Sequence, residues 1–311
     1  HPTHWLILLV KYFGELPGNS IAVGDISILQ LLSLYGIIIL VWLWRWLHKV
    51  WWIAGIMAIA LVFVPAWQTQ ASLFRLSLLA QDSEPVMVIQ DRGKVTLINS
   101  GDTDTARYTV LPFLRQEGIN KIDWAISTHA ELAKNNGWTT ILESLPIETF
   151  YDLPNGEQNS SNLPSIASNL QAHQANYQTL PVSQTVQIGS TAFNLINAEL
   201  PLLQFQIQGK NWLMLGNLQP DQAKELISKG KLPKTQVIWW SGQRLTPALL
   251  RVLKPVVAIA FSNSLDPETT NHLSKSKAQV YSTNRDGAIQ WTPQGGFETT
   301  MELTENQSSV L

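Results

Sequence analysis

Residues 122 to 138 read IDWAISTHAELAKNNGW, and this stretch decides how the chain folds and what it can do. The apolar side chains of residues 122, 124 and 126 alternate with their neighbours, which is the pattern of a β-strand. The strand ends in Ser127–His129 and leads into a polar loop before the next helix. His129 and Glu131 are residue types that can bind a metal ion, whereas the methyl of Ala133 and the ammonium of Lys134 offer no ligand.

The first seventy residues have a different composition from the rest of the 311-residue chain. Only 14% of all residues are charged, against ~25% in soluble domains, and this deficit lies near the N-terminus. Two uncharged runs, residues 26–44 and 50–67, are each long enough to cross a ~30 Å hydrocarbon core as a helix. A signal peptide is a poor interpretation of these runs, because there are two of them and both are internal. A buried helical hairpin of a soluble protein is the other alternative, but such helices seldom run this long without a charge. We therefore expect two transmembrane helices.

The charge between these runs predicts their orientation. Arg45–Lys49 is the basic cluster between them, and Lys and Arg accumulate on cytoplasmic connections. The helices are therefore expected to turn in the cytoplasm, with everything after residue 70 outside it. Leu6–Phe13 is too short to span and predicts a reentrant or interfacial segment. Because the sequence begins at His1, we expect a fragment whose missing N-terminal part holds further membrane helices.

Beyond residue 85 the sequence alternates between short β-rich runs and helices. The expected domains are a membrane region at 1–70, a linker at 71–84, a folded α/β (α+β) domain at 85–303 and a tail at 304–311. Strands are predicted at residues 86–90, 95–99, 122–126, 193–197, 202–208, 212–215, 237–240, 256–261, 280–282 and 288–291, the last two joined around Asp286-Gly287. Helices are predicted at residues 112–117, 220–228, from a cap at Thr246 to before Pro255, and at 267–276.

Composition also excludes several kinds of site. The chain has no cysteine, so it carries neither a disulfide framework nor a cysteine zinc site. Its formal net charge of -2 gives no overall basic footprint for nucleic acid.

The order of these motifs resembles the C-terminal half of ComEC-type competence proteins, the membrane channels for DNA uptake in natural transformation. The similarity is strongest in LINSG at residues 97–101, in TVLPFLRQEGINKIDWAISTH at 109–129 and in STNRDGAIQW at 282–291. The LPG at residues 16–18 also resembles the end of the family's competence region. The resemblance implies the end of that membrane region followed by an extracytoplasmic metallo-β-lactamase-like domain, an αββα sandwich. It further implies DNA, the lipid bilayer, other competence proteins and the missing N-terminal part as partners.

The sequence departs from this family at the positions that carry its chemistry. The family's LIDTG has Asn99 in place of Asp, its HxDxDH-type loop keeps only His129, with Glu131 as a possible substitute ligand, and its strand ending in GD ends here in Gly216-Asn217. These vestigial positions are Asn99, His129, Glu131, Ala133, Lys134, Asn217, Trp240, Ser241 and Leu265. The resemblance therefore implies a site that has lost most of its ligands.

Ligand number decides between an active and an inactive domain. A catalytic Zn²⁺ requires three protein ligands and an open position, and His129 with Glu131 supplies two at most. We therefore expect no cofactor and a catalytically inactive domain, a pseudoenzyme acting as a structural or DNA-contacting module. One alternative is an active nuclease using Zn or Mn at His129, Glu131 and Asn217, and another is a purely structural membrane-anchored module.

Three further features are open to a functional interpretation. Asp102 and Asp104 could form an acidic pair, but capping of the next helix is favoured. Ser241 beside Gly242 lacks the surroundings of a nucleophile turn and a histidine to act as its base. Of Trp239 and Trp240, one is expected in the core, and the other could face a groove and stack on DNA bases.

Overall fold

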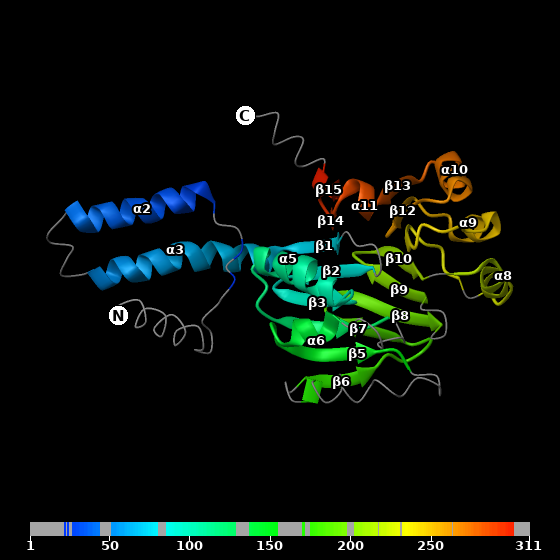
Figure 1. The fold of residues 1–311 in the computed structure, drawn as a ribbon, viewed down its shortest axis with the longest axis horizontal. Coiled ribbons are helices and arrows are strands. Elements are labelled where there is room, and N and C mark those ends of the chain that lie inside the picture. Colours follow the sequence, from blue (N-terminus) through cyan, green and yellow to red (C-terminus); the bar gives the residue numbers. More distant parts are fainter. Residues whose placement is uncertain are drawn as a thin grey trace. The chain divides into compact units, whose positions relative to one another are not determined.

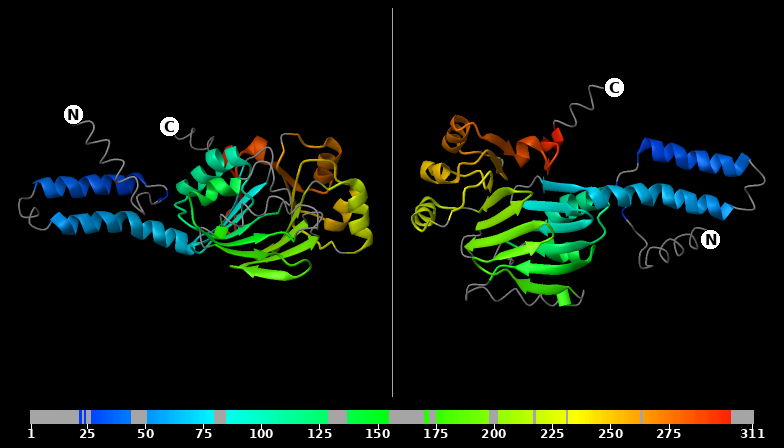
Figure 2. Two further views of the ribbon diagram at one scale, coloured as in Figure 1. Left: turned by 60° about the horizontal axis from the view of Figure 1, so that its bottom comes forward. Right: turned by 180° about the vertical axis from the view of Figure 1, so that it is seen from behind.

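The computed structural model describes residues 22, 24, 27–43, 51–79, 85–128, 137–154, 170–171, 175–197, 202–216, 218–230, 232–262 and 264–301, the side chains of 66, 67 and 69 excepted. These form two compact units, His1–Thr69 with Pro112–Asn120 and Gln70–Leu111 with Lys121–Leu311. Figure 1 and Figure 2 show the elements of each unit. Leu6–Phe13, Arg45–Lys49 and the tail at 304–311 lie outside the described residues, so their expected roles stay predictions.

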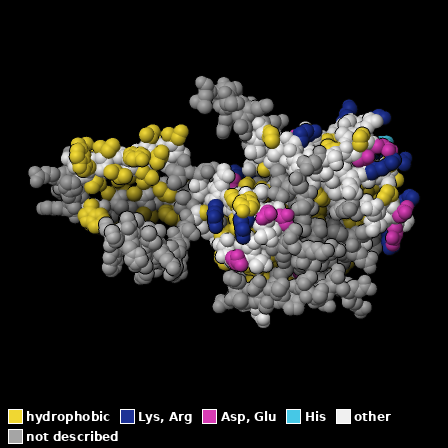
Figure 3. All heavy atoms as spheres, viewed as in Figure 1, with side chains coloured by type: hydrophobic (Ala, Val, Ile, Leu, Met, Phe, Trp, Pro, Cys, Tyr) yellow, Lys and Arg dark blue, Asp and Glu magenta, His cyan; other side chains and the backbone are white. Residues whose placement is uncertain are grey.

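Two apolar helices dominate the first unit. The first, α2 (Ile28–Leu43), lies within the uncharged run 26–44. The second, α3 (Trp51–Ser72), begins within the run 50–67 and extends five residues beyond it. Their apolar side chains are mostly exposed and cover both helices in Figure 3. The Gln30 side chain of α2 donates a hydrogen bond to the Leu61 carbonyl of α3 at 3.4 Å. Of the described helices, α3 alone is long and apolar enough to cross a membrane, and α2, at 16 residues, is shorter.

Pro112–Asn120 belongs to the same unit. The expected helix here is α5 (Leu111–Gln116), one residue earlier than predicted. Asn120, which follows α5, joins this segment to Ala22. Its side-chain amide accepts a hydrogen bond from the Ala22 backbone N–H and donates one to the Ala22 carbonyl, both at 2.7 Å.

The second unit is built on two mixed β-sheets. In the first sheet β3 to β6 run parallel, and in the second β10 to β13 do. The eight-stranded sheet has the order β15 (Gly296–Thr299), β14 (Ile289–Thr292), β1 (Phe74–Leu79), β2 (Val86–Asp91), β3 (Lys94–Ile98), β4 (Ile122–Ile126), β5 (Ile147–Asp152), β6 (Asn176–Thr179). The seven-stranded sheet has the order β13 (Gln279–Ser282), β12 (Val257–Ala260), β11 (Val237–Trp240), β10 (Lys210–Leu215), β9 (Leu202–Ile207), β8 (Thr191–Asn197), β7 (Thr185–Ile188).

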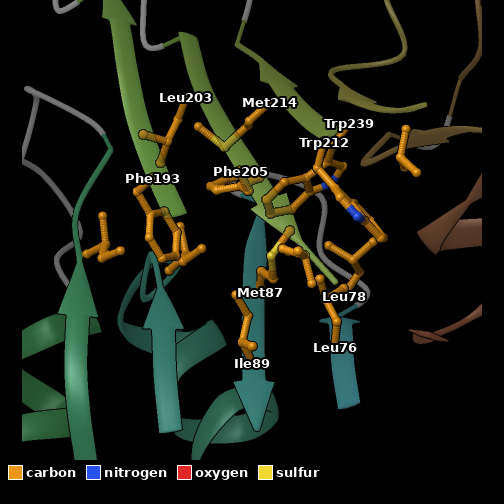
Figure 4. Close-up of a cluster of buried hydrophobic side chains, with 14 of the residues drawn as sticks. Leu76, Leu78, Met87, Ile89, Phe193, Leu203, Phe205, Trp212, Met214 and Trp239 are labelled. Atoms are coloured by element: carbon orange, nitrogen blue, oxygen red, sulfur yellow. The ribbon is translucent and has the colours of Figure 1, made fainter. Parts of the chain in front are cut away.

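The main core lies between these sheets. Alternate side chains of β1 and β2, such as Leu76, Leu78 and Met87, meet those of β8 to β12 (Figure 4). Trp212 of β10 is fully buried and its ring centre lies 5.7 Å from that of Trp291 in β14. This burial of large apolar side chains is the main source of stability of the sandwich.

Helices cover the outer faces of both sheets, which completes an αββα sandwich. On the seven-stranded sheet, α8 (Pro220–Ser228), α9 (Pro247–Leu253) and α10 (Pro267–Lys275) bury their apolar side chains in a second cluster. On the eight-stranded sheet, Trp138 of α6 (Gly137–Leu142) packs on Phe150 of β5 with ring centres 5.0 Å apart. The expected layer architecture is thus confirmed. The short helices α4 (Thr103–Thr105), η2 (Ala106–Val110) and α11 (Thr283–Asp286) complete the unit.

Two expectations about organisation were wrong. The expected linker at 71–84 contains β1, which pairs with β14 and β2 in the middle of a sheet, so the folded domain does not begin at residue 85. The strands expected at 280–282 and 288–291 form no hairpin: β13 lies in the seven-stranded sheet and β14 in the eight-stranded one, with α11 between them. Pairing with distant strands, rather than the local Asp286-Gly287 turn, determines where each strand lies.

Candidate functional site

The sequence-predicted site positions lie on loops that follow parallel strands. The carboxyl ends of parallel strands lie at one edge of their sheet, so the loops after β3 and β4 are neighbours, as are those after β11 and β12. Asn99 follows β3, Ser241 follows β11 and Leu265 lies beyond β12. Trp240 is the last residue of β11. The other five vestigial positions, His129, Glu131, Ala133, Lys134 and Asn217, lie outside the described residues.

Asn99 is the best-defined residue of this edge. Its side-chain oxygen accepts from the Thr128 backbone N–H at 2.8 Å and from the Thr128 hydroxyl at 3.0 Å. Its side-chain nitrogen donates to the Pro85 carbonyl at 3.0 Å. The residue is 2% exposed and has a φ of 60°, in the left-handed region that Asn tolerates better than most residues. One amide thus joins the start of β2 to the ends of β3 and β4.

This arrangement uses the chemistry of an amide rather than that of a carboxylate. An amide offers an acceptor and a donor, whereas an ionised carboxylate only accepts. The Pro85 carbonyl needs a donor, and the ionised Asp that the family pattern has at position 99 would leave two acceptors facing each other there. The Asn at this position is therefore matched to its neighbours as a structural bridge.

Gly101 and Gly137 fix the next contact of the same edge. The Gly137 N–H, at the start of α6, donates to the Gly101 carbonyl at 3.1 Å. A Cβ on Gly137 would lie 2.7 Å from that oxygen and 2.8 Å from Ala106 Cβ, so α6 can approach this closely only through a glycine. Thr128 and Gly137, the described residues on either side of 129–136, are thus both anchored to the turn at residues 99–101.

The acidic pair in this turn is structural, as predicted. Asp102 is the N-cap of α4 and accepts from the Thr105 N–H at 2.7 Å. Hydrogen bonds from Thr105 hold the pKa of Asp102 below its usual value. Asp104 lies in the first turn of the same helix. Capping accounts for the position of Asp102 without a metal ion.

On the seven-stranded sheet, the equivalent loops are closed by a tight turn at Gly242. This residue has a φ of 79°, and a Cβ there would lie 2.7 Å from Ser262 Cβ, in the loop after β12. Its carbonyl accepts from the Asp266 N–H at 2.9 Å, and Asp266 caps α10 by accepting from the Thr269 N–H at 2.7 Å. Leu265 packs on the apolar cluster beneath the helices. Among the described residues, none forms a hydrogen bond with the Ser241 side chain.

The expectation that Trp239 or Trp240 faces a groove and stacks on DNA bases was wrong. Trp239 and Trp240 are each 1% exposed. Trp239 points into the core between the sheets and Trp240 into the core beneath the helices, where its indole N–H donates to the Gln243 carbonyl at 3.2 Å. Because β11 is covered on both faces, alternation places both rings in apolar cores. Neither can stack on a base in this structure.

A buried carboxyl group at the end of β5 was missed by sequence reasoning. Asp152 is 1% exposed, accepts from the Leu153 N–H at 2.8 Å and from the Tyr177 hydroxyl at 3.1 Å. Burial raises the pKa of Asp152, and burial together with this carboxyl group raises the pKa of Tyr177 to about 12. The pair links β5 to β6. The period-two alternation of ETFYD could have marked Asp152 as inward-facing.

The described side chains of this edge do not fit a catalytic metal ion. They contain no group of three or more His, Asp or Glu residues close enough to hold one. The oxygen and the nitrogen of the Asn99 amide are both engaged with protein partners, and Asp102 is engaged as a cap. A catalytic dication needs at least three free ligands in a defined geometry. The described residues of this edge therefore support no chemical step through a metal ion.

Comparison with known proteins adds only distant structural similarity. No protein-family model and no curated protein matches the sequence. The structure is similar to Igni18, a metallo hydrolase from Ignicoccus hospitalis, with 13% identity, 70% of this chain and 99% of that chain covered, and a TM-score of 0.46. It is also similar to Zn²⁺-bound PqqB from Methylobacterium extorquens, with 12% identity, 66% of this chain and 96% of that chain covered, and a TM-score of 0.44. A third similar structure is Tm1679, a metal-dependent hydrolase of the β-lactamase superfamily, with 9% identity, 67% of this chain and 95% of that chain covered, and a TM-score of 0.43. At such identities and TM-scores, neither an activity nor a metal follows for this chain.

Proposed function

We propose that this chain is part of a ComEC-type DNA-uptake protein, anchored in the cytoplasmic membrane by α2 and α3, with a non-catalytic αββα domain outside the cytoplasm. In this proposal the domain serves the channel as a structural or DNA-contacting module. Its αββα layers are those that the sequence resemblance implies.

The bonds of Asn99 carry the non-catalytic part of the proposal. At the position where the family pattern has Asp, the amide satisfies one carbonyl and two donors of neighbouring segments. An amide with these bonds cannot bind a dication without breaking them, and a buried carbonyl left without a donor costs about 1–3 kcal/mol. This observation favours a structural loop over a hydrolytic centre.

The two apolar helices support the membrane-anchored part. The side chains of α2 and α3 that can be described include exposed Trp42, Trp51 and Trp52, all near the connection between the helices. Tryptophan is enriched at membrane interfaces, and the basic residues of that connection favour a cytoplasmic turn. Protease added to spheroplasts should then cut the polar segment 155–162, which lies outside the described residues, and protection of that segment would reverse the orientation.

A genetic experiment separates the proposed role from catalysis. In a transformable host that carries this gene, deletion of residues 73–303, which removes the whole domain including β1, should abolish uptake of labelled DNA, whereas His129→Ala and Glu131→Ala should leave uptake unchanged. If both point variants lose uptake while the protein remains in the membrane, the domain is catalytic. If the deletion itself retains uptake, the domain has no role in the channel.

A biochemical experiment tests the nuclease alternative directly. The purified chain should contain no stoichiometric Zn²⁺ or Mn²⁺ and should not cleave DNA. Metal-dependent nicking that His129→Ala abolishes would replace the proposal with an active nuclease.

A further inference from the structure

The amino-terminal edge of the parallel strands β10 to β13 carries a row of lysines. Lys210 lies two residues before Trp212, Lys234 three before Val237, Lys254 three before Val257 and Lys277 two before Gln279, and these four reference residues are aligned across the sheet. Strands are ~4.8 Å apart, so the row extends over roughly 15 Å. All four lysines are exposed, and among the described residues no carboxylate pairs with any of them.

Exposed apolar side chains lie within this row. Val256 is 60% exposed and Val252 37%, and both lie beside Lys254. A surface that combines lysines with aliphatic side chains fits a lipid interface, where the ammonium groups meet the headgroups and the aliphatic groups enter the region below them. Single-stranded nucleic acid is usually also stacked on exposed aromatic rings, which this row does not offer.

The chain enters the sandwich at the same edge. α3 ends at Ser72 and β1 begins at Phe74, so only Leu73 separates helix from strand. The ring centre of Phe74 lies 6.2 Å from that of Trp291, and the Lys210 ammonium lies 5.2 Å from the centre of the Trp291 ring. If α3 leaves the membrane at its carboxyl end, the lysine row is attached close to the headgroups by the chain itself.

Two of these lysines are held where glycine would be the more stable residue. Lys254 and Lys277 follow α9 and α10 with φ values of 50° and 61°, in the left-handed region. Non-glycine residues are disfavoured there, and glycine is the common residue at this position after a helix. Attraction to the helix carboxyl ends favours both lysines, but Lys210 is the first residue of β10 and ends no helix. A ligand for the whole row explains all four.

We propose that this edge, Lys210, Lys234, Lys254 and Lys277 with Val256, binds the anionic phospholipid headgroups of the membrane that α3 spans. The inference rests on the proposed membrane anchoring and adds the surface of the domain that faces the bilayer. The binding orients the sandwich so that the opposite edge, with Asn99 and Gly242, faces away from the membrane.

The absence of cysteine allows a clean test in the full chain. Val256→Cys introduces one thiol for an environment-sensitive fluorophore, and Gln243→Cys, exposed beyond the carboxyl end of β11, is the matched control. Each variant is reconstituted in vesicles of phosphatidylcholine alone or with phosphatidylglycerol, with a nitroxide on some headgroups. The label at position 256 should be quenched in the phosphatidylglycerol vesicles and much less in the neutral ones or at high salt, which screens surface charge. The label at position 243 should not be quenched in either.

The lysines are tested by Lys254→Gly with Lys277→Gly in the Val256→Cys chain. Each lysine near an anionic surface contributes about fivefold, so loss of both should lower the ratio of bound to free edge about 25-fold. Glycine relieves the left-handed backbone at both positions, so thermal stability should be kept or raised, which separates lost binding from unfolding.

The outcomes distinguish this inference from the proposed function. A chain that resists extraction by alkaline carbonate, yet shows no quenching at position 256, overturns the lipid surface and leaves the anchoring intact. Extraction of the chain overturns both. A label at position 256 that responds to single-stranded DNA but not to phosphatidylglycerol makes the row a nucleic-acid surface and also overturns the inference.

Discussion

Replacing Asn99 by Asp restores the family residue and tests whether this edge is a structural bridge or a metal site. The change is nearly isosteric and replaces the nitrogen that donates to the Pro85 carbonyl at 3.0 Å by an oxygen. Two acceptors then face each other in a site that is 2% exposed. The bonds from Thr128 are retained and become stronger when they meet a charge, which offsets part of the loss. Asn99→Asp should therefore destabilise the second unit by about 1–3 kcal/mol at neutral pH.

This destabilisation should depend on pH in a defined direction. A protonated Asp at position 99 can donate to the Pro85 carbonyl, whereas the ionised form cannot, and burial also disfavours the charge. The folded-state pKa of the new carboxyl group is therefore raised above its unfolded value of about 3.9. Below that value the variant should approach the wild type. Its stability should then fall relative to the wild type as the pH rises through the folded pKa.

The assay is urea unfolding of the full chain in detergent, followed by tryptophan fluorescence at pH 4 and pH 7.5. Several tryptophans of the second unit, including Trp138, Trp212 and Trp291, are buried and should report its unfolding. Asn271→Asp, on the exposed face of α10, is the matched control and should change stability by less than about 0.5 kcal/mol. Equal stability of Asn99→Asp and wild type at pH 7.5, or stabilisation of the variant by added Zn²⁺ or Mn²⁺, would refute the bridge.

Three further predictions concern single contacts. Gly137→Ala should destabilise the second unit by about 1–3 kcal/mol because its Cβ meets a backbone oxygen, whereas Gly55→Ala, with open space around it, should not; denaturant midpoints compare them. Asp266→Ala should cost about 1 kcal/mol by removing the cap of α10, and since the pKa of Asp266 is lowered, a pH series should show this contribution vanish as the pH falls below about 4. Burial raises the pKa of Asp152, so the wild-type protein should lose stability as the pH rises and this carboxyl group ionises; Asp152→Asn should remove that loss in a series from pH 4 to 8. The pKa of Tyr177 is raised to about 12, so the wild type should lose further stability between about pH 10, the unfolded pKa, and pH 12, and Tyr177→Phe should remove this second loss.

The regular elements were predictable where the local pattern is decisive. The helix at Pro220–Ser228 and the strands at Ile122–Ile126 and Val237–Trp240 have the predicted bounds, because proline, glycine and apolar periodicity mark their ends. The strand Phe74–Leu79 was missed, since it follows an apolar helix after one residue and carries no turn signal before it. Whether a strand is covered on one face or on both depends on distant segments. The sequence therefore could not show that both faces of β11 are covered, and one of its two tryptophans was wrongly expected to be accessible.

The site was predictable in position but not in its bonds. Comparison with the family motif drew attention to Asn99, but its partners lie 14 and 29 residues away, at Pro85 and Thr128. Nothing in the local sequence LINSG indicates that one amide will satisfy both segments. The cap at Asp102, by contrast, is bonded three residues along the chain and was predicted correctly.

The two edges of the sandwich differ in a way that connects these results. At the carboxyl edge of β3 and β4, the described polar side chains Asn99 and Asp102 are engaged in hydrogen bonds to the backbone and in a helix cap. At the amino edge of β10 to β13, lysines remain without carboxylate partners in the part of the chain that the structure describes, two of them at backbone positions that favour glycine. A row of exposed lysines attracts an anionic partner, whereas amides whose hydrogen bonds are satisfied within the fold do not. The intermolecular contacts of this domain should therefore be sought first at the lysine edge, next to the point where the chain leaves α3.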